Sequence, residues 1–592
     1  LNAGYDIQKL FNIDYRIGLN TYQQNDLEWY RPGSRGANGL GEITQGFNDY
    51  EEIESILMLS RSDRFSDHFA IQTRIGNNIN QQTVNSQSYI GREMLDFYIL
   101  DIDNTISQVT NGGDYTRQRL AGLFGELTLD WNSNLFLTFT GRNDWASTLP
   151  IESRSYFYPS ASLAFVFSDA FNMDPNGFLS RGKFIANFSK VGKAPDPYLL
   201  DPIYYVNLGE PDGLTAGLRD IDFPFFGNAG LTLENTLKDP NLKPEFTKTI
   251  ELGVELGFVQ NRITLDATIY QTKSDNQLSL LSLPSASGYD AFFTNFGAMT
   301  SKGAEITLGI TPIQTNDFNW TISGAFTKYK TTVDELFGDV QEIEIRALFG
   351  GSITPVLRVG EEYGVFRGTT SARDDEGNLL IDPSNGQIIN STEEKIIGNP
   401  NPDFTLGVVN SITWKGITLG AVLEWKQGGD LYSETVNGEM GRGVLDFQDD
   451  YRELGAVIPG VYGDNVTQQA LLDENGNKIP NQTLVELNDL YFGSSFGSNA
   501  QDEWLVFDAT VVRLREVTLG YTFPSKSLEN SGIKGVYIGL VGRNLWYNAP
   551  NFPEDSNFDP ETSTFGDVNY QGFDFQNLPS IRRFGFNFKL TF

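Results

Sequence analysis

Residues Ile250–Phe258 read IELGVELGF, with an apolar residue at every second position. The positions between them hold only glutamate and glycine. Because successive side chains of a β-strand point to opposite faces, this stretch predicts a strand with one apolar face and one charged face. Such a charged face could not be buried in an apolar core, so the strand needs water on one side and an apolar medium on the other.

The next stretch repeats the design. After the turn Gln260–Arg262, residues Ile263–Tyr270 read ITLDATIY, which alternates in the same way. Two alternating runs joined by a short polar turn predict an antiparallel hairpin.

The end of the chain carries the pattern in its most aromatic form. Residues Phe584–Phe592 read FGFNFKLTF, so that four phenylalanines and one leucine share a face up to the terminal carboxylate. A final strand of this kind is typical of outer-membrane β-barrels.

About sixteen strands follow from the same reasoning along the chain. The predicted ranges are 9–23, 50–60, 66–80, 115–130, 134–146, 157–168, 183–192, 250–258, 263–270, 302–311, 319–330, 403–413, 417–427, 509–522, 535–544 and 581–592.

The connections between these strands alternate in length. Short turns, such as those at Trp131–Ser133 and Trp414–Gly416, alternate with long connections. The long connections are predicted at 24–49, 81–114, 147–156, 193–246, 274–301, 331–402, 428–508 and 545–580. This asymmetry is typical of a transmembrane antiparallel β-barrel, which has short periplasmic turns and long extracellular loops. A β-propeller would repeat at a fixed period of about 40–50 residues, and the sequence has no such period.

Composition fits both a large β-barrel and a β-propeller. Of the 592 residues, 39% are hydrophobic and 13% aromatic, and the mean hydropathy is −0.29. The sequence lacks the run of about 18 apolar residues that a spanning helix needs, whereas a barrel strand exposes only alternate residues to lipid. The net charge of −33 argues against nucleic acid as a partner.

The residues give no sign of catalysis. There is no cysteine, and the single histidine, His68, excludes a multi-histidine metal site. Glu251 and Glu255 lie four apart on one strand, roughly 13 Å, which is too wide for a glycosidase pair. We therefore expect a protein that is not an enzyme, with no catalytic, metal or cofactor-binding residue.

Several motifs resemble one known family. The resemblance is carried, in chain order, by Gly141–Pro150 (GRNDWASTLP), Tyr156–Ser160 (YFYPS), Lys243–Glu255, Asn295–Glu305, Gly398–Phe404 (GNPNPDF), Val512–Tyr521 (VRLREVTLGY) and Gly542–Trp546 (GRNLW). Together they resemble the SusC/RagA-like, TonB-dependent transporters of Bacteroidetes, and the likeness spans nearly the whole chain.

This resemblance implies a 22-stranded barrel in the bacterial outer membrane. It implies active import of a large nutrient, an oligosaccharide or a peptide, driven by the TonB complex. A SusD-like surface lipoprotein would cover the long loops as a lid. Two alternatives stay open from the residues alone: a passive porin, and a soluble extracellular protein.

The family also carries a plug domain and a TonB-binding segment before the barrel. Neither is recognisable here, and about six strands are missing from the expected 22. We therefore expect residues 1–592 to be the C-terminal part of the barrel, with the plug, the TonB-binding segment and the first strands outside this sequence.

Two loop features bear on ligands. Asp382–Asn390 occupies the place of an Asp-rich, calcium-like loop in relatives, but it is poor in carboxylates and is predicted to be a plain turn. The aromatic segments Tyr204–Tyr205 and Phe223–Phe226 could stack on sugars or grip peptide side chains, or could pack against neighbouring loops. No substrate-binding residue is predicted.

Overall fold

The computed structural model describes most of the chain. The described residues are 1–7, 11–34, 37–205, 230–283, 285–345, 353–442, 444–445, 455–486, 501–524, 532–553, 556, 559–561, 563–564, 570–575, 577–578 and 580–592. They form two compact units. Unit 1 consists of Leu1–Phe165, Ile185–Ile250 and Lys273–Gly297, and unit 2 consists of Val166–Phe184, Glu251–Thr272 and Ala298–Phe592.

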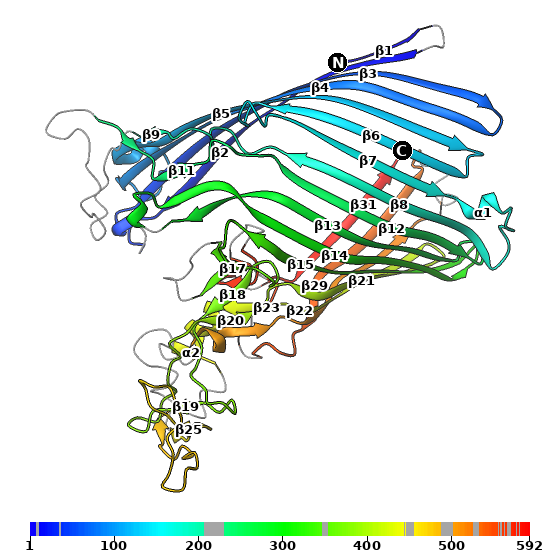
Figure 1. Cartoon of the computed structure of the whole chain (residues 1–592). Helices are drawn as coiled ribbons and strands as arrows, with labels where there is room; N and C mark the ends of the chain where they lie inside the picture. The colour runs from blue at the N-terminus through cyan, green and yellow to red at the C-terminus, as the bar shows by residue number, and fades with distance from the viewer. Residues whose placement is uncertain are drawn as a thin grey trace. The chain divides into compact units, whose positions relative to one another are not determined.

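Unit 1 is built on a series of antiparallel strands, each paired with the next along the chain (Figure 1). These strands are β1 (Asn2–Ile7), β2 (Phe11–Tyr30), β3 (Glu42–Ser66), β4 (Phe69–Met94), β5 (Thr105–Trp131), β6 (Leu135–Ala146) and β7 (Ser155–Phe165). The shorter elements of the unit are η1 (Ala37–Gly39), η2 (Ile102–Asn104), β9 (Tyr204–Tyr205), β10 (Thr232–Leu233), β11 (Thr236–Lys238) and η3 (Ser285–Ser287).

Unit 2 contains a second antiparallel series, in the order β15–β21–β22–β28–β29–β31. Its strands are β15 (Phe318–Leu336), β21 (Pro402–Trp414), β22 (Ile417–Gly428), β28 (Val511–Thr522), β29 (Gly535–Asn548) and β31 (Arg583–Thr591). Four further strands have residues in both units: β8 (Leu179–Lys193), β12 (Glu245–Phe258), β13 (Ile263–Ser282) and β14 (Ala291–Gln314).

The long connections of unit 2 contain their own short elements. These are β16 (Glu342–Glu344), β17 (Thr354–Arg358), β18 (Val365–Gly368), β19 (Leu380–Ile381), β20 (Lys395–Gly398), β23 (Asp430–Ser433), α2 (Glu434–Arg442), β24 (Gly455–Ala456), β25 (Val461–Tyr462), β26 (Val485–Glu486), η6 (Asp502–Leu505), β27 (Val506–Asp508) and β30 (Phe573–Asp574). The short helix α1 (Phe167–Ala170) lies in the connection between β7 and β8.

The predicted all-β, antiparallel fold is confirmed. Each of the sixteen predicted ranges overlaps a strand, and β1 and β11 add to the series by pairing with β2 and β14. Within the described ranges, no helix is both long and apolar enough to cross a membrane.

The tight hairpin turns follow from local backbone chemistry. Between β5 and β6, Asn132 and Ser133 both have positive φ, and between β21 and β22 the same is true of Lys415 and Gly416. Lys415 and Gly416 make up the whole turn between the paired residues Trp414 and Ile417, and two successive residues of positive φ match the twist of such a two-residue hairpin. At Gly416 a Cβ atom would also meet the carbonyl oxygen of Thr522 at 2.6 Å, so this position needs glycine.

The predicted lengths of several strands and loops were wrong. The predicted loops 24–49 and 81–114 are largely strand. In the first, β2 continues to Tyr30 and β3 begins at Glu42; in the second, β4 continues to Met94 and β5 begins at Thr105. The physical reason is that residues 81–88 (QQTVNSQS), apart from Val84, are polar on both faces of β4 and lack the alternation that marks a strand facing lipid. A spanning strand needs only about 9–11 residues, so the 26-residue β4 extends well beyond the hydrocarbon.

Candidate functional site

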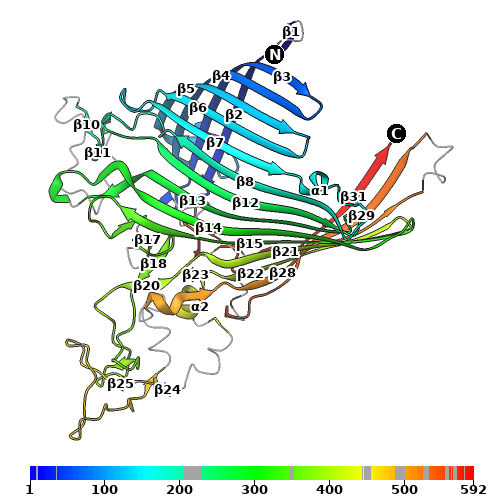
Figure 2. The ribbon, with the colours of Figure 1, turned by 45° about the vertical axis from the view of Figure 1, so that its right-hand side comes forward.

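The three long connections of unit 2 fold together. We call the described residues of 337–401 (the first connection), 429–510 (the second) and 549–582 (the third) the loop assembly. Figure 2 shows β17, β18, β20 and α2 gathered at one end of β15, β21 and β22. The second and third connections share a sheet, because β23 pairs with β27 and also with β30. The loop assembly is therefore a packed structure in its own right.

An apolar cluster from all three connections forms its core. The cluster contains Ile353, Phe366, Tyr432, Leu505 and Phe573, each at most 2% exposed. The rings of Phe366 and Phe573 lie 4.6 Å apart, centroid to centroid. Burying side chains of this size stabilises by about 1.5–3 kcal/mol each, which offsets the entropy lost when long connections become ordered.

The GNPNPDF motif forms the corner where the first connection returns to β21. The backbone N–H of Asn399 donates to Asp430 Oδ2 at 2.7 Å, and the side-chain amide of Asn401 donates to the carbonyl oxygen of Tyr363 at 2.9 Å. Burial raises the pKa of Asp430, although the bond from Asn399 acts in the other direction. The GNPNPDF motif therefore has a structural role, because its residues bind the first connection to β23 and to Tyr363.

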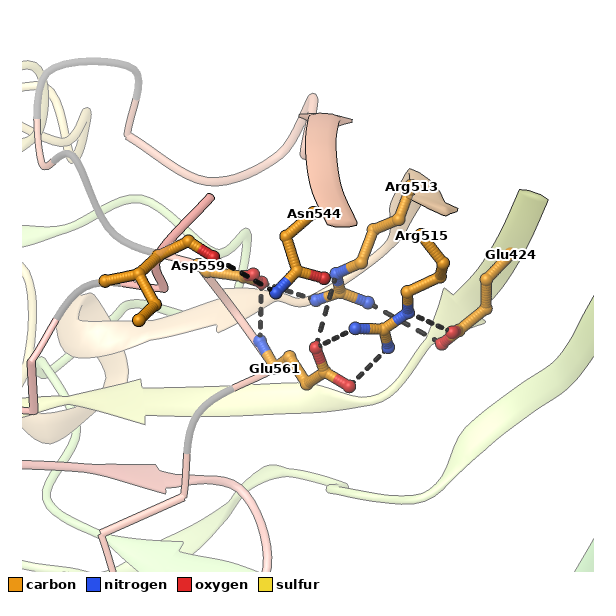
Figure 3. Close-up of polar contacts among 7 residues, drawn as sticks. Glu424, Arg513, Arg515, Asn544, Asp559 and Glu561 are labelled. Carbon is orange, nitrogen blue, oxygen red and sulfur yellow. Dashed lines mark hydrogen bonds and ion pairs between the residues drawn. The ribbon is translucent and has the colours of Figure 1, made fainter. Parts of the chain in front are cut away.

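An ion cluster joins the third connection to strands β22 and β28 (Figure 3). Arg513 Nη2 lies 2.5 Å from Asp559 Oδ1, and Arg515 Nε lies 2.5 Å from Glu424 Oε2. Arg515 also makes a two-pronged contact with the carboxylate of Glu561. In the pairing with β22, a register shift between Val422 and Leu423 leaves Arg515 as an extra residue in β28, and such bulges re-aim side chains. The cluster thus holds residues 559–561 against β22 and β28.

Beside this core is a small neutral cavity of about 150 Å³. It is lined by Tyr329, Thr331, Tyr363, Gly364, Pro400, Asn401 and Gln571. Tyr363 is tied to β15 through its backbone N–H, which donates to the carbonyl oxygen of Thr331 at 3.0 Å. Two tyrosines and two side-chain amides, with no charged group among the described lining residues, suit a neutral polar ligand group.

The residues considered in the sequence have local roles where the structure describes them. His68 Nδ1 lies 2.6 Å from Asn132 Oδ1 at a hairpin turn. Glu255 pairs with Arg181 and Lys183 on β8, with N–O distances of 3.1 and 2.9 Å. Tyr204–Tyr205 forms β9, which pairs with β10. Phe223–Phe226 lies outside the described residues.

The segment Asp382–Asn390 forms a turn that closes on a bridge between Ile381 and Ile388. The carboxylate of Asp382 accepts hydrogen bonds from Ser384 and from the side-chain amide of Asn465. These bonds hold the pKa of Asp382 below its usual range. Within the described ranges, no group of three or more histidine, cysteine or acidic residues is arranged to hold a metal ion.

Sequence reasoning missed the ion cluster and the neutral cavity. The run Val512–Tyr521 reads as an ordinary alternating strand, and the carboxylates that meet Arg513 and Arg515 lie in a distant connection. The available signal was a pair of arginines on the polar face of one strand. The cavity had no such signal, because its lining residues come from four separate segments.

Comparison with known proteins identifies relatives. Residues 1–451 match the family model for the TonB dependent receptor-like β-barrel. A TonB-dependent receptor of Formosa agariphila is 25% identical over 509 residues, which cover 81% of this chain and 47% of the relative. The TonB-dependent receptor SusC of Bacteroides thetaiotaomicron is 23% identical over 441 residues, covering 72% of this chain and 40% of SusC. The chain thus spans about half the length of the curated relatives it matches.

Among solved structures, the RagAB peptide transporter is similar in fold. Its TM-score is 0.73 at 17% identity, and the match covers 100% of this chain and 61% of the other. At this identity the likeness concerns the fold.

Proposed function

The chain belongs to the TonB-dependent receptor-like β-barrel family, whose members lie in the bacterial outer membrane, and from this premise we propose that it is the barrel portion of an active importer. Its cargo would be a nutrient too large for porins, an oligosaccharide or a peptide. The observation that carries the proposal is the loop assembly, with a packed core drawn from three connections and a neutral cavity against β15.

We further propose that residues 1–592 are the C-terminal part of a longer transporter. The relatives matched by this chain are about twice its matched length, which supports a plug domain, a TonB-binding segment and about six further strands elsewhere in the protein. A barrel of that size leaves a lumen wide enough to leak solutes unless it is filled. The plug would fill it, and TonB would act through the plug side of the protein.

A SusD-like surface lipoprotein is the proposed lid. Large aliphatic side chains stand exposed on the part of the loop assembly between residues 455 and 486. They are Val457 (44%), Val466 (88%), Leu472 (58%) and Leu484 (64%). Apolar residues within a charged surface are the usual anatomy of a protein interface, and a lid would remove them from water.

Native purification tests this assignment. The complete protein, extracted in mild detergent and examined by native mass spectrometry, should carry a lipoprotein subunit and should include a plug. In planar bilayers it should show no steady conductance. A particle without a plug, with a large and constant conductance, would favour the porin alternative.

A further inference from the structure

A second cavity, of about 400 Å³, lies in the loop assembly next to β20. Its lining residues are Thr370, Ser371, Arg373, Lys395, Ile396, Ile397 and Glu503. Lys395, Ile396 and Ile397 are consecutive residues of one strand, so the cavity follows the strand for most of its length. We call it the β20 cleft.

β20 is an edge strand. It pairs with β18 and stands at the end of the four-stranded sheet β16–β17–β18–β20. Among the described residues, Lys395, Ile396 and Ile397 make no backbone–backbone hydrogen bond outside that pairing. A strand edge with unpaired N–H and C=O groups is a template for an added extended chain.

The cleft also has an excess of positive charge. Lys395 is exposed and, in the part of the chain that the structure describes, forms no ion pair. Arg373 makes a long contact of 3.4 Å with Glu503, whose carboxylate is already bonded at 2.8 Å by the backbone N–H of Ser371. The neighbouring Glu394 is engaged by Arg367 at 2.8 Å. Two cations therefore line the β20 cleft beside one carboxylate.

The β20 cleft is apolar and aromatic along its floor and one side. Ile396 and Ile397 are half-buried, and Ile397 packs on the core cluster of Phe366 and Phe573. Trp504 stands at the side, where its Nε1 donates to Ser371 Oγ at 2.9 Å and the guanidinium of Arg373 lies 6.0 Å from its ring centre. This arrangement leaves space for an aliphatic side chain beside a carboxylate.

We propose that the β20 cleft binds the C-terminal residues of an extended peptide. The peptide backbone pairs with the free edge of β20, Lys395 and Arg373 hold its terminal carboxylate, and an aliphatic side chain rests on Ile396 and Ile397. The inference rests on the proposed import function and names its cargo as peptide. A saccharide has no row of alternating donors and acceptors to match a strand edge, and the Trp504 ring is partly covered by Arg373.

Fluorescence anisotropy on the purified complete protein tests this. The probe is a fluorescein-labelled hexapeptide of alternating serine and valine with a free C-terminal carboxylate. Its C-terminal amide, and a version with alternate backbone amides N-methylated, should each bind at least tenfold more weakly. Lys395→Ala and Arg373→Ala should weaken the carboxylate peptide about tenfold and change the amide little. The control Lys193→Ala, on β8, removes a cation outside the cleft whose side chain is 79% exposed and should leave binding unchanged.

Equal binding of the carboxylate and amide peptides, or unchanged binding by Lys395→Ala, would overturn the inference. Lys395-dependent binding of oligogalacturonate, without binding of the peptides, would also overturn it. TonB-dependent uptake of a glycan without peptide binding would reject the β20 cleft alone. Peptide binding without TonB-dependent uptake would reject the proposed function.

Discussion

Arg513 Nη2 lies 2.5 Å from Asp559 Oδ1, and the two side chains are only 4% and 6% exposed. Arg513 belongs to β28, and Asp559 belongs to the connection that follows β29. A buried pair of this kind costs desolvation energy for both ions, so its removal one ion at a time is more damaging than its replacement. The pair therefore locks the loop assembly to the strands.

We predict that Asp559→Ala lowers the free energy of unfolding by about 3–5 kcal/mol, because it removes the nearest carboxylate from a buried guanidinium whose other acidic neighbours, Glu561 and Glu424, lie 3.7 and 3.8 Å away. Urea titration in detergent micelles measures this. Lys193→Ala, which breaks an exposed pair with Glu245, is the control and should cost about 0–1 kcal/mol. Equal effects of the two substitutions would contradict the role assigned to the buried pair.

Phe366→Ala should loosen the loop assembly while leaving the strands intact. Truncating a fully buried phenylalanine costs about 3–5 kcal/mol, and here the loss falls on the cluster that holds the three connections together. Limited proteolysis should then cut the connections much faster, with barrel assembly unchanged. Wild-type resistance to protease would show that the cluster is not what orders them.

The sequence predicted the strands well because lipid imposes a two-residue period. Ile250–Phe258 and Phe584–Phe592 are recognisable for that reason alone. The polar extensions of β4 and β5 were missed because water surrounds both of their faces and imposes no period. The loop assembly was missed because its contacts are non-local: Phe366 and Phe573 gain their neighbours only from distant connections. Nothing in the residues around Lys395 indicated an open strand edge, which is a property of the pairing.

On β12, Leu252 and Val254 are predicted to face lipid, whereas Glu255 lies on the opposite face with Arg181 and Lys183. Val254→Arg should therefore cost about 2–4 kcal/mol near the bilayer midplane. The temperature at which the folded band shifts on an electrophoresis gel measures this loss of stability, with Val254→Ile as the matched control. Assembly and heat stability like those of Val254→Ile would contradict the orientation.

The turn at Asp374 should respond to acid. Burial acts to raise the pKa of Asp374, but bonds from Asn378 and Lys478 hold that pKa well below its usual range. In turn, the bonds from Lys478 to Asp375 and Asp374 raise the pKa of Lys478. A depressed carboxyl pKa gives stability that is present above the unfolded value of about 3.9 and is lost as pH falls through the folded value. The difference in melting temperature between wild type and Asp374→Asn should thus be full at pH 7 and should shrink progressively as the pH falls below about 3.9. A difference that stayed constant across this range would contradict the assignment.

We propose that this barrel belongs to an energy-driven importer, and the sharpest test of this proposal is uptake in living cells. Cells that express the complete protein would be given labelled oligosaccharide and peptide mixtures, with TonB present or deleted. Accumulation of the cargo should fall at least tenfold without TonB, while membrane levels of the protein stay the same. Accumulation at the same rate without TonB would contradict active import and would instead describe a passive pore.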